Sequence, residues 1–181
     1  MSCANYPLFC IVEEDMVSLG IQSGSYSLSG SSTKRIKISW NNYYSYYAGN
    51  ARLHGSSAWM PGYTRPGQYL EINFGSSKYI TGIATQGTGR WNENNFVRSY
   101  SLQYYDGKNW IGYKEFGEKK IFPGNTDVSS VVKNFLSVPT AMQKLRIYPE
   151  SWNNEIALRI ELYSNPSIST QNCIQYTPTT S

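Results

Sequence analysis

The sequence predicts an all-β domain built as a β-sandwich or barrel. Short segments in which apolar and polar residues alternate recur along the chain, with turn residues between them. This pattern is typical of strands that bury one face. Asp106-Gly107 separates two such segments and is a strong hairpin signal. No 3.6-residue apolar period runs long enough for a substantial helix. Many short strands without helices indicate a sandwich or barrel.

The expected strands follow one another at steady spacing. In chain order they are Ile36–Ser39, Leu70–Phe74, Ile80–Gln86, Arg98–Tyr105, Trp110–Tyr113, Lys144–Tyr148 and Ile156–Tyr163. In the last of these, every second residue is Ile or Leu, and the positions between them include Arg159 and Glu161. We therefore expect one face of this strand in the core and the other in water.

Composition restricts the class of protein. At 181 residues the chain is one domain by length. Its 16 Tyr and 5 Trp side chains each combine an apolar ring with a hydrogen-bonding group, which suits binding surfaces that are partly in contact with water. The net charge of +4 is modest and the basic residues are scattered, which argues against nucleic acid as a partner. No apolar run reaches the length of a transmembrane segment.

The segment from Trp40 to Asn50 is unusual because it carries four tyrosines in five positions and no aliphatic side chain among them. Neither a strand with one dry face nor an amphipathic helix fits this pattern. Asn, Ser and Gly around the rings supply turn chemistry. The segment is therefore predicted to be a loop that presents aromatic rings for binding. The alternative is that the rings fold back onto the sandwich and serve only as packing.

The cysteines Cys3, Cys10 and Cys173 all lie near the ends of the chain. They form no CxxC pair, and a single His cannot complete a usual zinc site. We expect a Cys10–Cys173 disulfide that ties the two ends together, worth about 4–5 kcal/mol in the chain-entropy model. The alternatives are a bridge from Cys3 to Cys173, or three free thiols in a reducing compartment.

The sequence does not indicate an enzyme. It contains no GxSxG, HExxH or phosphate-binding loop, and the strand pattern places no carboxylate pair at a shared cleft. His54, the single His, belongs to no Ser or Cys constellation that would make a catalytic set. No cofactor is predicted. The loop with Asn125 and Asp127 is the one candidate for bound calcium, although it lacks the acidic spacing of a calcium loop.

An ordered set of short motifs resembles the discoidin family, also called the coagulation factor 5/8 type C domain. The matching segments are Leu19-Gly20-Ile21, Ala51-Arg52-Leu53, Ala58-Trp59, Tyr69–Gly75, Thr85-Gln86-Gly87, Ser99–Tyr104, Phe122-Pro123-Gly124-Asn125, Leu145–Pro149 with Ser151-Trp152, and Ala157–Tyr163. The resemblance covers residues 10–164, with an N-terminal extension at 1–9 and a tail or linker at 165–181. It implies an eight-stranded jelly-roll-like β-sandwich with loops protruding at one end, and a non-catalytic binding role.

In the frame of this family, the tyrosine segment falls on the first protruding loop and Gly87–Phe96 on a second one. In membrane-binding members, such loops insert apolar side chains into lipid while basic groups hold the head group. The resemblance therefore selects ten candidate ligand-binding residues from the two loops and their flanks. They are Trp40, Tyr43, Tyr44, Tyr46, Tyr47, Arg90, Trp91, Asn95, Phe96 and Arg98.

The expected function is that of an extracellular adhesion module, which is secreted or lies on the outer side of a larger, membrane-attached multidomain protein. Its ligand on a cell surface or matrix would be bound through the aromatic loops. A surface protein, an anionic phospholipid such as phosphatidylserine, and a glycan remain as alternatives, because tyrosine rings suit all three.

Overall fold

The computed structural model describes residues 16–89 and 93–166 of the chain. Within these residues it contains strands and loops and one turn of 3₁₀ helix, η2 (Ala48–Asn50). The strands are β1 (Val17–Ser18), β2 (Ser27–Gly30), β3 (Arg35–Ser39), β4 (Asn42–Ser45), β5 (Leu70–Gln86), β6 (Phe96–Tyr105), β7 (Trp110–Gly112), β8 (Lys114–Glu115), β9 (Glu118–Lys119), β10 (Phe122–Pro123), β11 (Val132–Asn153) and β12 (Arg159–Ser164). The extension at 1–9, most of the tail, the predicted Cys10–Cys173 disulfide and Cys3 lie outside the described residues.

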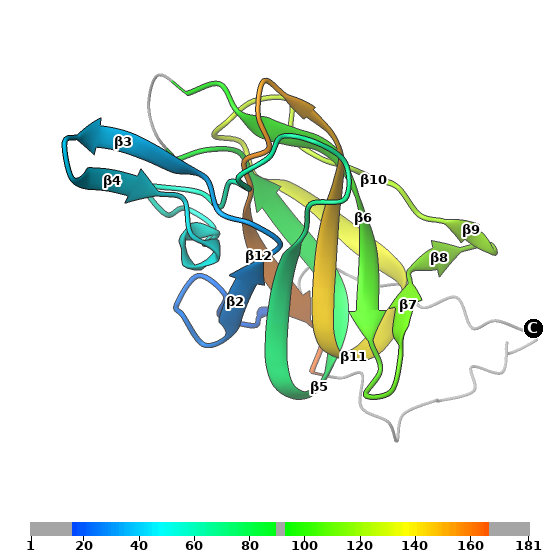
Figure 1. Cartoon of the computed structure of the whole chain (residues 1–181). Helices are drawn as coiled ribbons and strands as arrows, with labels where there is room; N and C mark the ends of the chain where they lie inside the picture. Colours follow the sequence, from blue (N-terminus) through cyan, green and yellow to red (C-terminus); the bar gives the residue numbers. More distant parts are fainter. Residues whose placement is uncertain (1–15, 90–92, 167–181) are drawn as a thin grey trace, which may run out of the picture.

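Eight strands form one antiparallel sheet in the order β1-β12-β5-β11-β6-β10, with β2 also paired to β5 and β7 to β6. The first half of β5 pairs with β2 and its second half with β12, so β5 belongs to both walls of the sandwich. Register shifts in β11 between Phe135 and Thr140, and between Met142 and Lys144, interrupt the β5–β11 ladder. Such irregularities bend strands, and the sheet curls on itself to enclose the core (Figure 1). The predicted all-β sandwich is confirmed.

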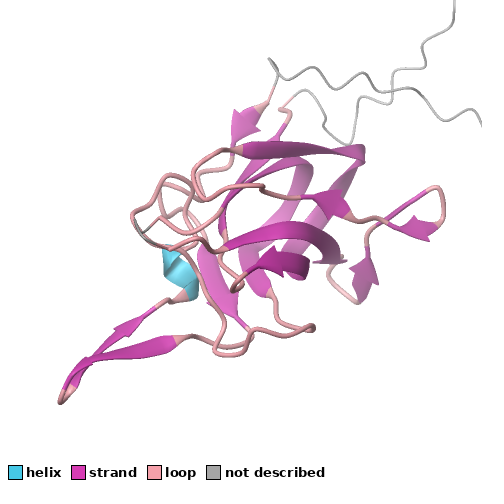
Figure 2. Cartoon of the chain, turned by 90° about the horizontal axis from the view of Figure 1, so that it is seen from above, coloured by secondary structure: helices cyan, strands magenta, loops and turns pink. Residues whose placement is uncertain are grey.

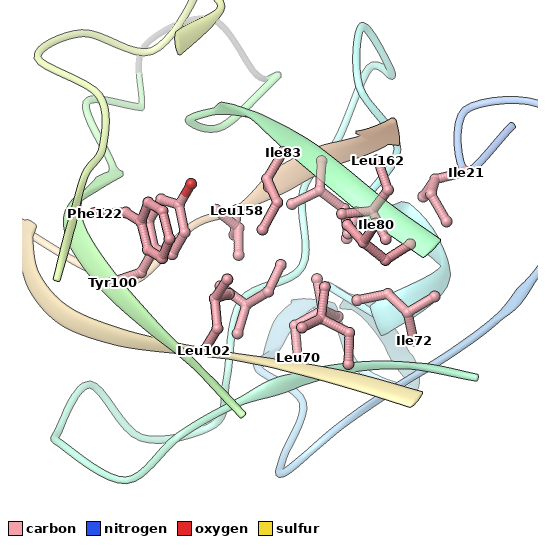
Figure 3. Close-up of a cluster of buried hydrophobic side chains, with 14 of the residues drawn as sticks. Ile21, Leu70, Ile72, Ile80, Ile83, Tyr100, Leu102, Phe122, Leu158 and Leu162 are labelled. Carbon is pink, nitrogen blue, oxygen red and sulfur yellow. The ribbon is translucent and has the colours of Figure 1, made fainter. Parts of the chain in front are cut away.

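The core lies between the two walls and is formed by side chains from both (Figure 3). Tyr100 and Phe122 stack with their ring centroids 5.4 Å apart. Trp59 is fully buried, and its indole Nε1 donates to the carbonyl oxygen of Ser32 at 3.0 Å. Gly30 allows this packing, because a Cβ there would lie 2.4 Å from the Trp59 nitrogen. The indole therefore fixes the path of the chain just before β3.

The predicted strands are present, with two differences. The two expected strands at 70–74 and 80–86 are parts of the single strand β5. The last strand starts only at Arg159, and its second face is not in water, because both Arg159 and Glu161 are buried. The Glu161 carboxylate accepts hydrogen bonds from the backbone N–H groups of Ile21 and Gln22, each at 2.9 Å. Loops cover this face, which the alternation in a single strand cannot reveal.

Two small hairpins stand outside the main sheet. The β3–β4 hairpin projects as a long ribbon on one side of the domain, and the shorter β8–β9 hairpin extends on the other side (Figures 1 and 2). The turn at Asp106-Gly107, which joins β6 to β7, is closed by the Asp106 carboxylate on the backbone N–H of Lys108 at 2.7 Å. No helix of the described residues is long and apolar enough to cross a membrane.

Candidate functional site

The tyrosine segment forms the second strand of the β3–β4 hairpin, so the prediction of a loop is wrong for Tyr43 and Tyr44. Ile36 pairs with Tyr44 and Lys37 with Tyr43, while a register shift between Lys37 and Ser39 leaves Ile38 as a bulge. A two-stranded ribbon needs no dry face of its own, so its residues need not alternate in the way that identifies a strand of the main sheet. The ribbon turns at Trp40 and Asn41.

Two of the candidate rings anchor the hairpin instead of being presented by it. Tyr46 is 2% exposed and packs in a small cluster with Met60 and Ala157. Tyr44 packs on Tyr46 edge to face, with centroids 4.9 Å apart, and its hydroxyl donates to Ser57 Oγ at 2.9 Å. For Tyr44 and Tyr46 the packing alternative therefore describes the structure, and Tyr46 cannot contact a ligand directly.

The exposed part of the hairpin is apolar and basic. Trp40 is 84% exposed at the tip, and Ile38, Tyr43 and Tyr47 are exposed as well. The Arg35 guanidinium lies 5.0 Å from the centre of the Tyr43 ring, and the Lys37 ammonium 5.5 Å from that of Trp40. These distances are within the range of cation–π attraction.

No acidic residue balances this charge nearby in the sequence. Residues 16–70 contain no Asp or Glu at all. Lys34 forms an ion pair with Glu155, whereas Arg35 and Lys37 form none with any described residue. The hairpin therefore carries two basic groups that are available to an anionic ligand.

The second predicted loop meets the first at the base of the hairpin. The hydroxyl of Tyr46 donates to one carboxylate oxygen of Glu93 at 2.6 Å, and the Thr88 hydroxyl donates to the other at 2.8 Å. The backbone N–H of Thr88 also donates to the Asn95 carbonyl at 2.9 Å, which closes the loop. The two segments thus lie at the same end of the domain, as the family resemblance predicts.

The individual residues of the second loop are placed differently from one another. Arg90 and Trp91 lie outside the described residues. Asn95 and Phe96 are buried, so neither presents its side chain to a ligand in this structure. Arg98 is exposed and donates to the Asn153 side-chain oxygen at 2.6 Å, which holds it over the edge of the loop. Among the described candidates of this loop, Arg98 is the one that remains accessible.

Sequence reasoning missed a third element at this end, the loop from Pro61 to Gly67. Tyr63 is exposed, and the Arg65 guanidinium lies 4.9 Å from the centre of its ring. The loop is tied to the chain entering β3, because the Gly62 N–H donates to Ser32 Oγ at 2.9 Å. The sequence signal for this element was an aromatic and a basic residue between prolines and glycines. From the sequence, the segment was interpreted only as a long loop around Trp59.

Arg159 fixes the loops at this end from inside. Its guanidinium donates to the backbone carbonyls of Gly87 at 2.7 Å, Gly55 at 2.6 Å and Val128 at 3.0 Å. Burial lowers the pKa of Arg159, but a guanidinium stays protonated in proteins at any physiological pH. Arg159 is thus a structural cation whose donors are used by the protein.

An open pocket of ≈ 350 Å³ lies beside Arg159, and His54, Gln86 and Ser129 are among its lining residues. Its lining residues include no Phe, Tyr or Trp, the large rings on which sugars usually stack. At the edge of the pocket, the Asp127 carboxylate accepts hydrogen bonds from the hydroxyl and N–H of Ser130 and from the N–H of Ser129. These hydrogen bonds lower the pKa of Asp127 to about 2.

The loop that we considered for calcium is held by its own hydrogen bonds. The Asp127 carboxylate accepts from the backbone N–H of Ser130 at 2.6 Å, and the Asn125 amide donates to the Ser130 carbonyl at 2.7 Å. The described residues contain no group of three His, Cys, Asp or Glu side chains placed to hold a metal ion. These hydrogen bonds close the turn from Asn125 to Ser130.

Comparison with known proteins agrees with this geometry. Residues 28–162 match the model of the F5/8 type C domain. Coagulation factor V of Bos taurus is 35% identical over 159 residues, which cover 85% of this chain and 7% of that protein. Lactadherin of Bos taurus is 38% identical over 128 residues, which cover 69% of this chain and 29% of that protein. The chain therefore spans less than a third of the length of either relative.

Two solved structures show the same fold. Discoidin II from Dictyostelium discoideum superimposes with a TM-score of 0.66 at 26% identity, covering 90% of this chain and 63% of that one. A family 32 carbohydrate-binding module from Clostridium perfringens, solved with galactose, gives a TM-score of 0.58 at 14% identity over 82% of this chain and 99% of that one. The second likeness concerns the fold alone. On the family match and the relatives together, the chain belongs to the F5/8 type C domain family.

Proposed function

We propose that the chain is an extracellular adhesion module that attaches to cell surfaces by inserting the tip of the β3–β4 hairpin into anionic phospholipid. The observation that carries the proposal is the exposed Trp40 at the tip with Arg35 and Lys37 directly behind it. Trp prefers the interface between head groups and hydrocarbon. Basic groups near an anionic leaflet each add about 1 kcal/mol.

The neighbouring elements support this orientation. Tyr63 with Arg65, and Arg98 at the second loop, place two further basic groups on exposed parts of the same end. Tyr43 and Tyr47 are exposed further back along the hairpin, and tyrosine suits the head-group level. A membrane surface takes apolar side chains deepest and basic and tyrosine side chains nearer the water. The hairpin presents its side chains in this order from the tip to the base.

The test is sedimentation with phosphatidylcholine vesicles, with and without phosphatidylserine. The wild-type chain should bind only the vesicles that contain phosphatidylserine. Burying an indole ring contributes about 4 kcal/mol at ~25 cal/mol per Å², so Trp40→Ser should weaken binding by at least roughly 100-fold. Its stability should stay unchanged, because the ring is 84% exposed.

Phe116→Asn is the matched control, since it removes a fully exposed ring from the β8–β9 hairpin on the other side of the domain. This variant should bind the vesicles as the wild type does. Equal binding by Trp40→Ser and wild type would exclude insertion of the hairpin. Binding to a glycan array with no binding to vesicles would instead identify the domain as a lectin.

A further inference from the structure

The β3–β4 hairpin is held to the domain at its base. It forms a two-stranded sheet of its own, and within the described residues no ladder joins it to the main sheet (Figure 2). At the base, the Lys34 N–H donates to the Met60 carbonyl at 2.8 Å, and the Met60 N–H donates to the Tyr46 carbonyl at 3.3 Å. A two-stranded ribbon has little stability of its own. Its direction therefore depends on such contacts at the base.

The Tyr46 side chain extends this attachment to the second loop. Its ring is buried beside Met60, which fixes the position of its hydroxyl. The hydroxyl donates to Glu93 Oε1 at 2.6 Å. The other carboxylate oxygen, Oε2, accepts from the Thr88 hydroxyl at 2.8 Å. One carboxylate thus connects the base of the hairpin to Thr88, at the start of the second loop.

The charge of Glu93 is unfavourable for the function proposed above. Residues 16–70, which include the hairpin, contain no acidic residue, whereas the second loop contains this one. An anionic membrane repels a carboxylate and attracts the basic groups of the hairpin. A carboxylate also offers two acceptor oxygens, and here each of them accepts from a hydroxyl of a different element. These two hydrogen bonds give a reason for the side chain that its charge does not.

We propose that Glu93 is a positioning residue that holds the β3–β4 hairpin and the second loop in one relative orientation, so that both meet the same surface. The effect on membrane binding rests on the proposed function, whereas the coupling of the two elements does not. A ligand that needs both elements binds only the molecules in which they are aligned. Aligning them before binding removes this loss of affinity. Glu93 acts through Tyr46 and Thr88 and touches no ligand itself.

Amide hydrogen exchange of the lipid-free chain, followed by NMR, tests the coupling. The reporter is the Thr88 N–H, which donates to the Asn95 carbonyl at 2.9 Å and closes the second loop. Tyr46→Phe removes only a hydroxyl from the hairpin, and it should increase exchange at Thr88 by about 5-fold. In a Glu93→Ala background it should cause no further increase, because the connection is already lost. Wild-type exchange at Thr88 in Tyr46→Phe would overturn the proposal.

Tyr44→Phe is the matched control for this experiment. The Tyr44 hydroxyl donates to Ser57 Oγ at 2.9 Å, so this variant also removes one hydroxyl from a tyrosine that anchors the hairpin. Exchange at Thr88 should stay unchanged. An increase as large as that in Tyr46→Phe would mean that loosening the hairpin in any way reaches the second loop, and that Glu93 has no special part.

Vesicles that contain phosphatidylserine test the effect on binding. Glu93→Ala and Glu93→Gln remove the same negative charge, but Gln can still accept from the Tyr46 hydroxyl and donate to Thr88 Oγ1. Glu93→Ala should weaken binding by about 10-fold, because fewer molecules have the two elements aligned. Glu93→Gln should bind at least as tightly as the wild type.

The comparison of the two Glu93 variants separates position from charge. Equal binding by Glu93→Ala and Glu93→Gln would show that the residue acts through its charge alone, and the proposal would fail. A wild-type chain that binds no vesicles would refute the phospholipid ligand, while exchange at Thr88 would still decide whether Glu93 couples the hairpin to the second loop.

Discussion

The β3–β4 and β8–β9 hairpins are alike in construction and differ in charge. Each is a two-stranded ribbon outside the main sheet, and each exposes a large ring at its tip, Trp40 in one and Phe116 in the other. The β3–β4 hairpin carries only basic charges, whereas the β8–β9 hairpin carries both signs. An exposed ring alone therefore does not specify the partner. The charges around the ring decide whether an anionic surface attracts it, and only the β3–β4 hairpin is purely basic.

The two hairpins also differ in how their tips are held. Trp40 has an ordinary backbone conformation, while Phe116 has a positive φ. The β3–β4 hairpin is anchored by buried tyrosines, and the β8–β9 hairpin by ion pairs of Glu115 and Lys119. Relieving backbone strain at the tip should consequently affect the second hairpin and leave the first unchanged.

Neutralising the basic groups of the β3–β4 hairpin should have a large effect on binding, second only to that of Trp40→Ser. At about 1 kcal/mol for each basic group, Arg35→Gln with Lys37→Gln should weaken binding to phosphatidylserine vesicles by roughly 30-fold. The salt dependence of binding should decrease as well. Vesicle sedimentation over a series of salt concentrations measures both.

Lys108→Gln with Lys114→Gln is the control for this prediction, because it removes the same net charge from exposed lysines outside the β3–β4 hairpin. If both double variants lose affinity equally, the overall charge of the chain attracts it to the membrane and the hairpin has no special part.

Relieving the turn at Phe116 should have an intermediate effect. Phe116→Asn should raise the free energy of unfolding by about 1 kcal/mol, because Asn tolerates the left-handed region. Trp40→Asn, at a tip without positive φ, should change it by less than about 0.5 kcal/mol. Urea denaturation of the two variants gives this comparison. A loss of stability in Phe116→Asn would show that the ring contributes to its own domain after all.

Acid should have the smallest effect, and it should act on the β8–β9 side. Burial tends to raise the pKa of Glu115, but hydrogen bonds from Lys120 and Ser137 outweigh it and the pKa is lowered. The pKa of Glu150 is lowered in the same way, with Lys119 and Ser101 outweighing burial. A lowered pKa stabilises the fold above the unfolded value of about 4.3, and this stabilisation is lost as the pH falls below it.

Glu115→Gln with Glu150→Gln should therefore flatten the decrease in unfolding free energy between about pH 5 and pH 3. Urea denaturation at several pH values within this range is the measurement. An unchanged slope in the double variant would mean that other carboxylates account for the acid sensitivity.

The local pattern of apolar and polar residues was sufficient to predict the strands. It was insufficient to predict which of the aromatic rings are exposed. Leu70–Phe74 and Arg98–Tyr105 were predicted correctly, because alternation follows directly from a sheet with one dry face. Tyr43 and Tyr46 look equivalent in the sequence, but one is exposed and the other buried. That difference depends on Met60 and Ala157, which reach Tyr46 from distant parts of the chain.

The sequence by itself determined the fold class, the order of the strands and the aromatic and basic character of the segment after Thr33. These properties follow from local alternation, turn residues and an ordered set of family motifs. Tertiary structure decided which rings face water, because that depends on contacts between segments far apart in the chain. The Glu93 carboxylate that receives the Tyr46 hydroxyl lies 47 positions along the chain. Only the folded chain shows that Trp40 projects at the tip of a hairpin while Tyr46 holds its base.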